Sequence, residues 1–396
     1  MTRGGTWDPG IRFARLRGCL VLSVLLAGGC GTGSREDDAG AGAGDVRESI
    51  DDPGTVGDPG SADDPGIDAG DEAVDAGTDA AGEGVDAGPD AAPVSCPAIE
   101  PAVSAGDLQG TDLAEVSGLV ASRRHAGVLW GHNDSGDTPR VFALVLPGEG
   151  GEAAVQAIEY TLNRGMVGWE GVEDSWEKMA DDWEDISLGP FAGFGGDAIF
   201  VGDTGDNSLS RESIRLYVFP EPSELVGGDI RDVRFFDIVY EDGPRDCESL
   251  FVDPRTGDVY LVEKEYVEDV ASVYRVDAGM LDGAHEGPLV AKGVGRVPVA
   301  VATGADMSAD GGLLAIRNYG QFEAPGLNGL LFTRDAGTTI EEMLASRGCP
   351  LPNVVDEPAQ EFQGETIAFA PDGSGFYTAS ERIFVPQPVH FWGLAR

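Results

Sequence analysis

The chain has 396 residues, of which 70 are acidic and 26 are lysine or arginine, so its formal net charge is −44 at pH 7. This balance excludes nucleic-acid binding, because no basic stripe exists that could neutralise phosphates. The part from Cys96 onward is long enough for one large all-β domain.

The first thirty residues have the order of a secretion signal. Arginines within residues 12–17 precede an apolar run at residues 20–26, and Ala-Gly-Gly then leads to Cys30. The pattern resembles a bacterial lipoprotein signal peptide, in which residues 1–29 are removed and Cys30 is lipidated. That resemblance implies export to the cell envelope, at the outer membrane of a Gram-negative bacterium, with a lipid anchor in the membrane. An ordinary secretory signal is the alternative, whereas a spanning helix would need ~20 apolar residues.

Residues 30–95 are a low-complexity segment of Gly, Ala, Asp and Pro with repeated D-P-G and D-A-G. Such a segment has almost nothing to bury, so we expect a disordered, self-repelling tether. Its aspartates lack the fixed spacing of a calcium-binding loop, which favours a solvated spacer over calcium repeats.

One short pattern recurs along the rest of the chain. In residues 182–207, an acidic residue opens an apolar strand, a Gly/Pro turn follows, and a second strand ends in a polar, turn-forming cluster. The same pattern recurs with its leading residue at Ser117, Glu184, Glu248, Thr303 and Glu365. The spacing of about 55 to 67 residues is the period of a four-stranded propeller blade with generous loops.

Further strands follow in each unit. We expect third strands at residues 140–146, 214–219, 271–276, 329–333 and 389–394, and fourth strands at residues 154–161, 233–240 and 289–299. The last unit ends after its third strand, so the segment around residues 97–103 is predicted to supply the missing fourth strand and close the ring. The sequence therefore predicts a β-propeller of five four-stranded blades over residues 96–396.

Six blades are the alternative, and a sixth would have to lie within residues 117–184. Residues 169–185 contain W-E-G, W-E-K and W-E-D at intervals of seven residues. This heptad spacing fits either an amphipathic helix or an acidic loop made by a slipped duplication. A duplication explains the extra length and favours five blades.

Three cysteines fall in the predicted propeller, namely Cys96, Cys247 and Cys349. Disulfides persist in exported proteins, and an odd number leaves one thiol over. We favour a Cys96–Cys349 pair, since both lie just outside core strands next to the predicted closure, whereas Cys247 directly precedes an inner strand.

Polar residues are predicted to gather at one edge of every blade, because the start of one antiparallel strand and the end of the next share an edge. Strand heads contribute Glu184, Asp185, Glu248 and Glu365, and second-strand ends contribute His132, Asp134, Asp137, Asp203, Asp206, Asn207, Glu263, Arg317 and Glu381. Converging carboxylates repel one another or take up protons unless a cation lies among them. Hard oxygen ligands suit calcium best, followed by magnesium or manganese.

We therefore predict calcium ligands at Glu184, Asp185, Asp203, Asp206, Glu248 and Glu365, and a ligand-binding rim of Asp134, Asn207, Glu263, Arg317 and Glu381. The alternative is that the G-D-T-G-D-N and H-N-D-S-G-D runs are turns whose Asp and Asn side chains cap their own backbone.

Five motifs carry a resemblance to a known group: S-G-L-V-A-S, H-N-D-S-G-D, D-W-E-D-I, G-D-T-G-D-N and G-E-T-I-A-F. Over residues 103–396 the chain resembles bacterial secreted propellers related to the esterase-like, phytase-like group. The resemblance implies calcium on an acidic face, at the same six predicted metal ligands. The cations that hold phosphate in phytase-type propellers have only Lys264, Arg317 and Arg382 as counterparts at this edge.

Two functions follow from these features. The first, which we favour, is a surface-tethered, calcium-stabilised propeller that binds a small molecule or a protein without chemistry. The second is a metal-dependent phosphoesterase or esterase in which His132 acts as acid or base. A histidine beside Asn and Asp is more often a turn residue, and Ser135 lacks the context of a nucleophile elbow.

Overall fold

The structure is a computed structural model that describes residues 96–108, 112–148, 154–162, 179–281, 287–318, 329–352, 361, 364–381 and 387–395. The predicted signal, Cys30, the tether, most of the W-E-D duplication and Arg382 lie outside these residues. Within the described part of the chain, no helix is long and apolar enough to cross a membrane.

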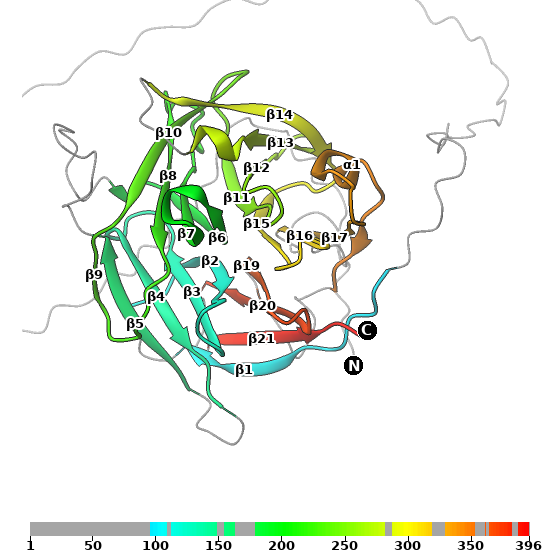
Figure 1. Ribbon diagram of the computed structural model, residues 1–396. Coiled ribbons are helices and arrows are strands. Elements are labelled where there is room, and N and C mark those ends of the chain that lie inside the picture. Colours follow the sequence, from blue (N-terminus) through cyan, green and yellow to red (C-terminus); the bar gives the residue numbers. More distant parts are fainter. Residues whose placement is uncertain are drawn as a thin grey trace, which may run out of the picture. The chain divides into compact units, whose positions relative to one another are not determined.

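The described strands form five antiparallel sheets of four strands each, which surround a common axis (Figure 1). Blade I contains β2 (Val116–Ala121), β3 (Val128–Asn133), β4 (Arg140–Val145) and β5 (Ala154–Leu162). Blade II contains β6 (Trp183–Phe191), β7 (Gly196–Asp203), β8 (Ile214–Pro220) and β10 (Arg234–Tyr240). Blade III contains β11 (Cys247–Val252), β12 (Val259–Glu263), β13 (Ala271–Val276) and β14 (Leu289–Val297).

The last two blades are less regular. Blade IV contains β15 (Ala302–Met307), β16 (Leu313–Asn318), β17 (Gly329–Thr333) and the two-residue strand β18 (Cys349–Pro350). The short helix α1 (Ile340–Leu344) lies between β17 and β18 in the chain and buries three apolar side chains. Blade V contains β19 (Gly364–Phe369), β20 (Gly375–Ser380), β21 (Pro388–Gly393) and, from the other end of the chain, β1 (Val103–Leu108).

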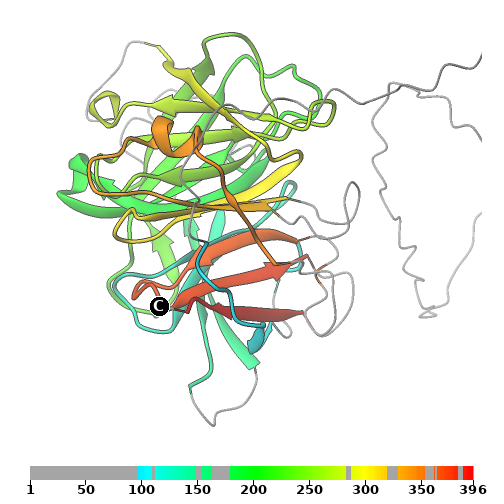
Figure 2. The same cartoon turned by 90° about the vertical axis from the view of Figure 1, so that its right-hand side faces the viewer.

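The ring of blades is closed. The innermost strands contact one another in the order β2, β6, β11, β15, β19, and β19 contacts β2 again. Strand β1 pairs antiparallel with β21 and completes blade V, as Figure 2 shows with β1 in cyan beside the red C-terminal strands. The protein is thus a β-propeller, and its described residues contain five four-stranded blades and no sixth.

The closing strand begins later than the sequence analysis predicts. Residues 97–103 were expected to form it, but regular pairing starts at Val103, and Ile99 makes only an isolated bridge with Leu394. Pro97 and Pro101 have no backbone N–H to donate to a ladder, which explains the delay.

Outer strands also join neighbouring blades. β1 pairs in parallel with β5, and β10 pairs in parallel with β14. The short strand β9 (Gly228–Ile230), which follows β8 of blade II, pairs with β5 of blade I. Backbone groups at these outer edges are therefore paired rather than left available to other chains.

The core lies between the faces of adjacent sheets. Trp183 of blade II packs against Tyr217, with ring centroids 5.7 Å apart, and Trp130 of blade I packs against Tyr160 at 5.4 Å. These large side chains are almost completely buried. Inner strands are buried on both faces because each is covered by a neighbouring blade on either side.

Cys96 and Cys349 form a disulfide, which is the pair that the sequence analysis favours. It links the chain just before β1 to β18, and so joins the closing strand of blade V to blade IV. Cys247 is a free, buried thiol.

Candidate metal centre

The leading residue of every repeat is a β-bulge. In each inner hairpin the pairing register skips one residue, and the skipped residues are Ser117, Glu184, Glu248, Thr303 and Glu365. A bulge leaves its extra residue out of the ladder and re-aims the side chain. Blades II, III and V carry a glutamate at this position.

The residue before each bulge pairs with the last residue of the second strand, as in Trp183↔Asp203 and Gly364↔Ser380. The residue after the second strand therefore stands next to the bulge. In blades I, II, III and V this position holds Asp134, Thr204, Lys264 and Glu381. Strand heads and second-strand ends thus share one edge, as predicted.

Five carboxylates from three blades meet at this edge, and we call them the acidic cluster: Asp134, Asp182, Glu184, Glu365 and Glu381. Oxygens of Asp134, Asp182 and Glu184 all lie within 4.8 Å of one another, and the same holds for Asp134, Glu365 and Glu381. Both glutamates at bulges are only 4% exposed. The cluster therefore offers oxygen ligands at a spacing that a metal ion could bridge.

Burial and mutual repulsion raise the pKa values of several carboxyl groups in the cluster. Burial raises the pKa of Glu184 well above its ordinary value, and the charges of Glu248 and Asp134 add to that. Burial likewise raises the pKa of Asp182 to about 7, and burial with the charge of Glu365 raises that of Glu381 to about 8. Without a cation, Asp182 and Glu381 would be partly protonated at neutral pH.

Among the described residues, Lys264 brings a positive charge to this edge, and Arg211 brings another beside Asp182. Lys264 Nζ forms a buried ion pair with Glu248 Oε1. Burial alone would lower the pKa of Lys264, but the charges of Glu248 and Glu365 raise it above its ordinary value. The ammonium group of Lys264 compensates the charge of Glu248, and the negative charges of the other carboxylates still outnumber the positive charges nearby.

Gly205, in the G-D-T-G-D-N motif, lets two of the carboxylates approach the backbone. A Cβ atom there would lie 2.1 Å from Glu184 Oε1 and 2.4 Å from Asp182 Oδ2, far inside van der Waals contact. A larger residue at this position would require both carboxylates to move.

Asp246 borders the cluster and is 5% exposed. Its Oδ1 accepts a hydrogen bond from Asp206 N at 2.9 Å, whereas its Oδ2 has no hydrogen-bond partner among the described residues. Its charge contributes to the raised pKa values of Asp134 and Asp182. A buried carboxylate oxygen without a donor is costly unless a cation compensates it.

Asp185, a predicted calcium ligand, lies apart from the cluster. It is 1% exposed, and its carboxylate accepts hydrogen bonds from the backbone amides of Ile186 (2.8 Å), Leu250 (2.8 Å) and Ala305 (3.0 Å). These contacts tie the inner strands of blades II, III and IV together. Asp185 therefore acts as a structural hydrogen-bond acceptor, which does not favour its predicted role as a metal ligand.

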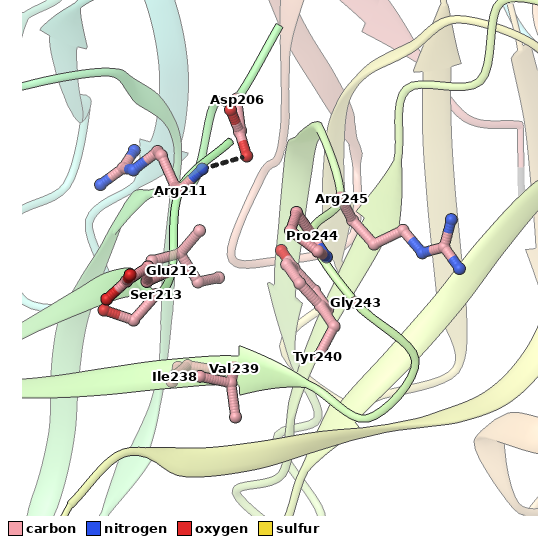
Figure 3. A pocket seen from close by; sticks show the side chains of 11 residues that line it. Asp206, Arg211, Glu212, Ser213, Ile238, Val239, Tyr240, Gly243, Pro244 and Arg245 are labelled. Atoms are coloured by element: carbon pink, nitrogen blue, oxygen red, sulfur yellow. Dashed lines mark hydrogen bonds between the residues drawn. The ribbon is translucent and has the colours of Figure 1, made fainter. Parts of the chain in front are cut away.

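Asp203 and Asp206, also predicted as calcium ligands, organise the chain beside the cluster. Asp203 pairs with Arg211 at 2.8 Å and accepts from Asp182 N at 3.2 Å, which positions Asp182. Asp206 accepts from Ser210 N and Arg211 N, both at 2.9 Å, and so closes a turn. Figure 3 shows the contact with Arg211. For these two residues the turn interpretation describes the contacts better.

Some of the predicted ligand-binding residues belong to the acidic cluster, and the others make structural contacts or lie in a turn. Asp134 and Glu381 belong to the cluster, whereas Asn207 is exposed in a turn. Glu263 pairs with Arg245 at 3.4 Å and accepts from Ser272 N at 3.3 Å. Only two of these five side chains therefore take part in the cluster.

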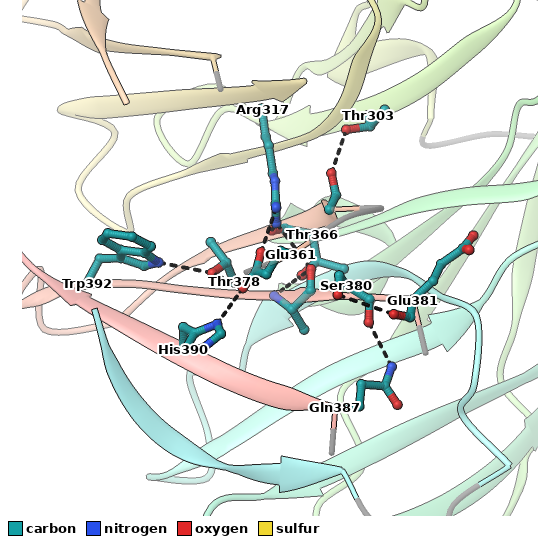
Figure 4. A network of polar contacts seen from close by, with 12 residues as sticks. Thr303, Arg317, Glu361, Thr366, Thr378, Ser380, Glu381, Gln387, His390 and Trp392 are labelled. Carbon is teal, nitrogen blue, oxygen red and sulfur yellow. Dashed lines mark hydrogen bonds and ion pairs between the residues drawn. The ribbon is translucent and has the colours of Figure 1, made fainter. Parts of the chain in front are cut away.

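Arg317 is 2% exposed and its guanidinium is occupied. It pairs with Glu361 Oε2 at 2.6 Å and donates to the carbonyls of Thr366 and Ala379 (Figure 4). Glu361, which no repeat position marks, also contacts His390 Nδ1 at 2.6 Å and accepts from Thr378. Arg317 is thus part of a buried network between blades IV and V.

His132 is completely buried, and its ring packs edge to face on Trp183 with centroids 5.6 Å apart. Its Nδ1 lies 2.8 Å from the carbonyl oxygen of Asn133. Burial lowers its pKa to about 4, so the ring is neutral near pH 7. This placement does not favour a role for His132 as acid or base.

Asp182 and Asp246 were missed as site residues, although the repeat contained a signal. Each stands two positions before a bulged glutamate, Glu184 or Glu248, and Glu115 holds the same position in blade I. An acid at that position precedes the inner strand and lies at the same edge as the bulge.

A small cavity lies between the turn at Asp206 and strand β10 (Figure 3). Its volume is about 70 Å³, far below the size of ordinary ligand pockets. Its arginines are already paired, Arg211 with Asp203 and Arg245 with Asp242. The cavity does not extend the acidic cluster.

No protein-family model and no curated protein matches the chain. Among solved structures, the chain is similar to the Dos1 propeller, with 11% identity, a TM-score of 0.32, and coverage of 70% of this chain and 68% of that one. It is also similar to the β-propeller domain of Cps50 (Swd1) from Myceliophteria thermophila (13%, TM-score 0.32, 71% and 70%) and to a Trichoderma reesei carbohydrate-active enzyme of family AA12 (11%, TM-score 0.34, 72% and 82%). Likenesses this distant carry no argument about function, and the fold is given by the strand pairing itself.

Proposed function

We propose that this protein is a membrane-tethered, extracytoplasmic propeller that binds calcium in its acidic cluster and uses that face to bind a small molecule or a protein. The observation that carries the proposal is the convergence of Asp134, Glu184 and Glu365 from three blades, with Asp182 and Glu381 beside them. Local turns do not require such a convergence.

Calcium is the cation that this donor set suits best. The cluster consists of carboxylate oxygens, without a histidine or cysteine in either group of three. Calcium accepts six to eight oxygen ligands in flexible geometry, whereas zinc and copper prefer nitrogen or sulfur. Glu184 and Glu365 are buried and the other three carboxylates are half-buried, so a bound cation would relieve a repulsion that water screens incompletely.

The tether is the part of the proposal that rests on sequence. The lipoprotein-like signal supports a lipid anchor at Cys30, and the acidic composition of residues 30–95 supports an extended spacer between the membrane and the propeller. The disulfide between Cys96 and Cys349 fits an exported protein, where such bonds persist.

A calcium-dependent melt tests the metal site. Because calcium binds only the folded state, stability should rise by about 2.7 kcal/mol at a hundredfold excess over Kd. Glu184→Gln should weaken that response and, with chelator present, should cost little or even stabilise. Glu159→Gln, on an exposed side chain of β5, serves as the control. An unchanged melt of the wild type across calcium concentrations would leave the acidic cluster without its proposed cation.

The described residues do not favour the phytase-like phosphoesterase or esterase alternative. His132 is buried, Arg317 is paired with Glu361, and Lys264 is paired with Glu248. Incubation with generic phosphoester and ester substrates, with and without calcium, should therefore show no turnover. Calcium-dependent hydrolysis would favour the hydrolase over the binding protein without enzymatic activity.

A further inference from the structure

The acidic cluster has two halves that share one residue. Asp134, in blade I, belongs both to the group with Asp182 and Glu184 of blade II and to the group with Glu365 and Glu381 of blade V. Asp182 and Glu381 do not occur in a common group of three. We propose that the cluster binds two divalent cations, one in each half, with the carboxylate of Asp134 bridging them.

The order of the blades supports this division. The inner strand β2 of blade I contacts β6 of blade II on one side and β19 of blade V on the other. Asp134 therefore stands between the bulged glutamates of its two neighbours, Glu184 and Glu365. Each half then has the same make-up: one bulged glutamate, one further acid from the same blade, and Asp134. Two ions with a shared carboxylate satisfy this arrangement, and a single ion would leave one half unfilled.

The charge at this edge also exceeds what one ion can offset. The five carboxylates of the cluster are joined by Glu248 and Asp246. Among the described residues, Lys264 and Arg211 bring positive charge to this group. One divalent ion would leave three of the cluster's five carboxylate charges without compensation in a site where two carboxylates are buried and three are half-buried. A second divalent ion would compensate two further negative charges.

An independent feature points to a ligand in the first half. Asp246 Oδ2 is buried and has no hydrogen-bond partner among the described residues, and its charge acts on Asp134, Asp182 and Glu248. Native proteins rarely leave such an oxygen without a partner. Gly205 adds to this, because its missing side chain gives Glu184 and Asp182 their places. The first half therefore has a neighbouring carboxylate oxygen to which the described residues donate no hydrogen bond.

The inference rests on the proposed function, and the number of bound ions separates the two. Calcium binding to the full chain, stripped of metal beforehand, would be measured by equilibrium dialysis and calorimetry. We expect two ions per chain for the wild type. Asp182→Asn should remove the ion of the first half, and Glu381→Gln the ion of the second, so each variant should retain one. Asp134→Asn should weaken both.

A control variant and a folding test separate loss of an ion site from other effects of the substitutions. Glu159→Gln should bind two ions. The acidic segment at residues 30–95 is present in every variant, so any calcium bound there would add equally to each count and leave the differences between variants unchanged. A melt with chelator identifies any variant that fails to fold. The two-ion inference would be overturned if the wild type bound one ion and both Asp182→Asn and Glu381→Gln lost it. The proposal that the cluster binds calcium would still stand. No bound ion in any protein would overturn both.

Discussion

The carboxylate of Glu361 is a buried charge with three side-chain partners. Burial acts to raise its pKa, but the charge of Arg317 and the hydrogen bonds from His390 and Thr378 outweigh burial and hold the pKa below its ordinary value. Arg317 belongs to β16 of blade IV, whereas Thr378 and His390 belong to blade V. This single side chain therefore connects two blades next to the closure.

Replacing Glu361 should be costly. Glu361→Ala leaves the guanidinium of Arg317 buried without its counter-ion, and losing one partner of a buried pair typically costs about 3–5 kcal/mol. Glu159→Ala removes an exposed ion pair with Arg140 and should change stability by less than about 1 kcal/mol. Chemical denaturation at neutral pH compares the two, and equal midpoints would show that the network contributes little.

The contribution of Glu361 should depend on pH in a defined direction. Because its folded-state pKa lies below the unfolded value, the stabilisation is present above the ordinary glutamate pKa of ~4.3 and is lost as pH falls below it. The stability difference between wild type and Glu361→Gln should therefore shrink on acidification. Denaturation series at several pH values measure this difference, and a constant gap would contradict the assignment.

The absence of a side chain at Gly205 should be needed for calcium binding, because Glu184 and Asp182 lie against this residue. Gly205→Ala places a methyl group against Glu184 and Asp182, so we expect a loss of calcium stabilisation of tenfold or more in apparent Kd, about 1.4 kcal/mol. Gly196→Ala, where the added Cβ meets nothing within 4 Å, is the matched control. The calcium-dependent melt reports both, and an unaltered response in Gly205→Ala would place the ion elsewhere.

The sequence predicts the cluster residues that occupy repeat positions, namely Glu184, Glu365, Asp134 and Glu381. It does not separate Glu184 from Asp185, although only the first faces the cluster. The bulge sends the two side chains to different places, and Asp185 accepts from amides in blades III and IV that are remote in sequence. Glu361 is unpredictable for the same reason, since its partners come from three separate strands.

At the scale of elements, the inner hairpins are the most predictable. Apolar runs separated by tight turns, such as the Asp372-Gly373 turn before β20, define both strands of a hairpin locally. Strand β18 was not predicted, because it has two residues and follows a helix that itself lacks a long apolar period. Its pairing with β17 depends on the surrounding blade rather than on its own sequence.

The disulfide should stabilise the propeller by closing a long loop. Cys96 and Cys349 are 253 positions apart, and cross-links of this kind typically contribute on the order of 2–4 kcal/mol. Adding reductant should lower the melting temperature of the wild type. Cys96→Ser should melt at the lower temperature with or without reductant, and a reductant effect of equal size in that variant would point to another cause.

At the scale of the whole molecule, two truncations should have opposite outcomes. Removing residues 31–95 takes away a segment with little apolar surface, so the melting temperature should stay nearly unchanged. Removing residues 1–108 also deletes β1, which exposes the edge of β21 and breaks the pairing with β5. We expect that chain to lose cooperative unfolding in calorimetry or to aggregate. A large effect of the first deletion would show that the segment packs on the propeller.

The position of the disulfide also sets how the molecule would respond to a pulling force. Tension applied from the N-terminal side reaches Cys96 before it reaches β1, because the cysteine precedes the strand in the chain. The covalent bond passes the load to Cys349 in blade IV, so the hydrogen bonds between β1 and β21 are spared. In the reduced protein the same load would act on the closing strand directly. The oxidised propeller should therefore withstand a larger extension force before its ring opens.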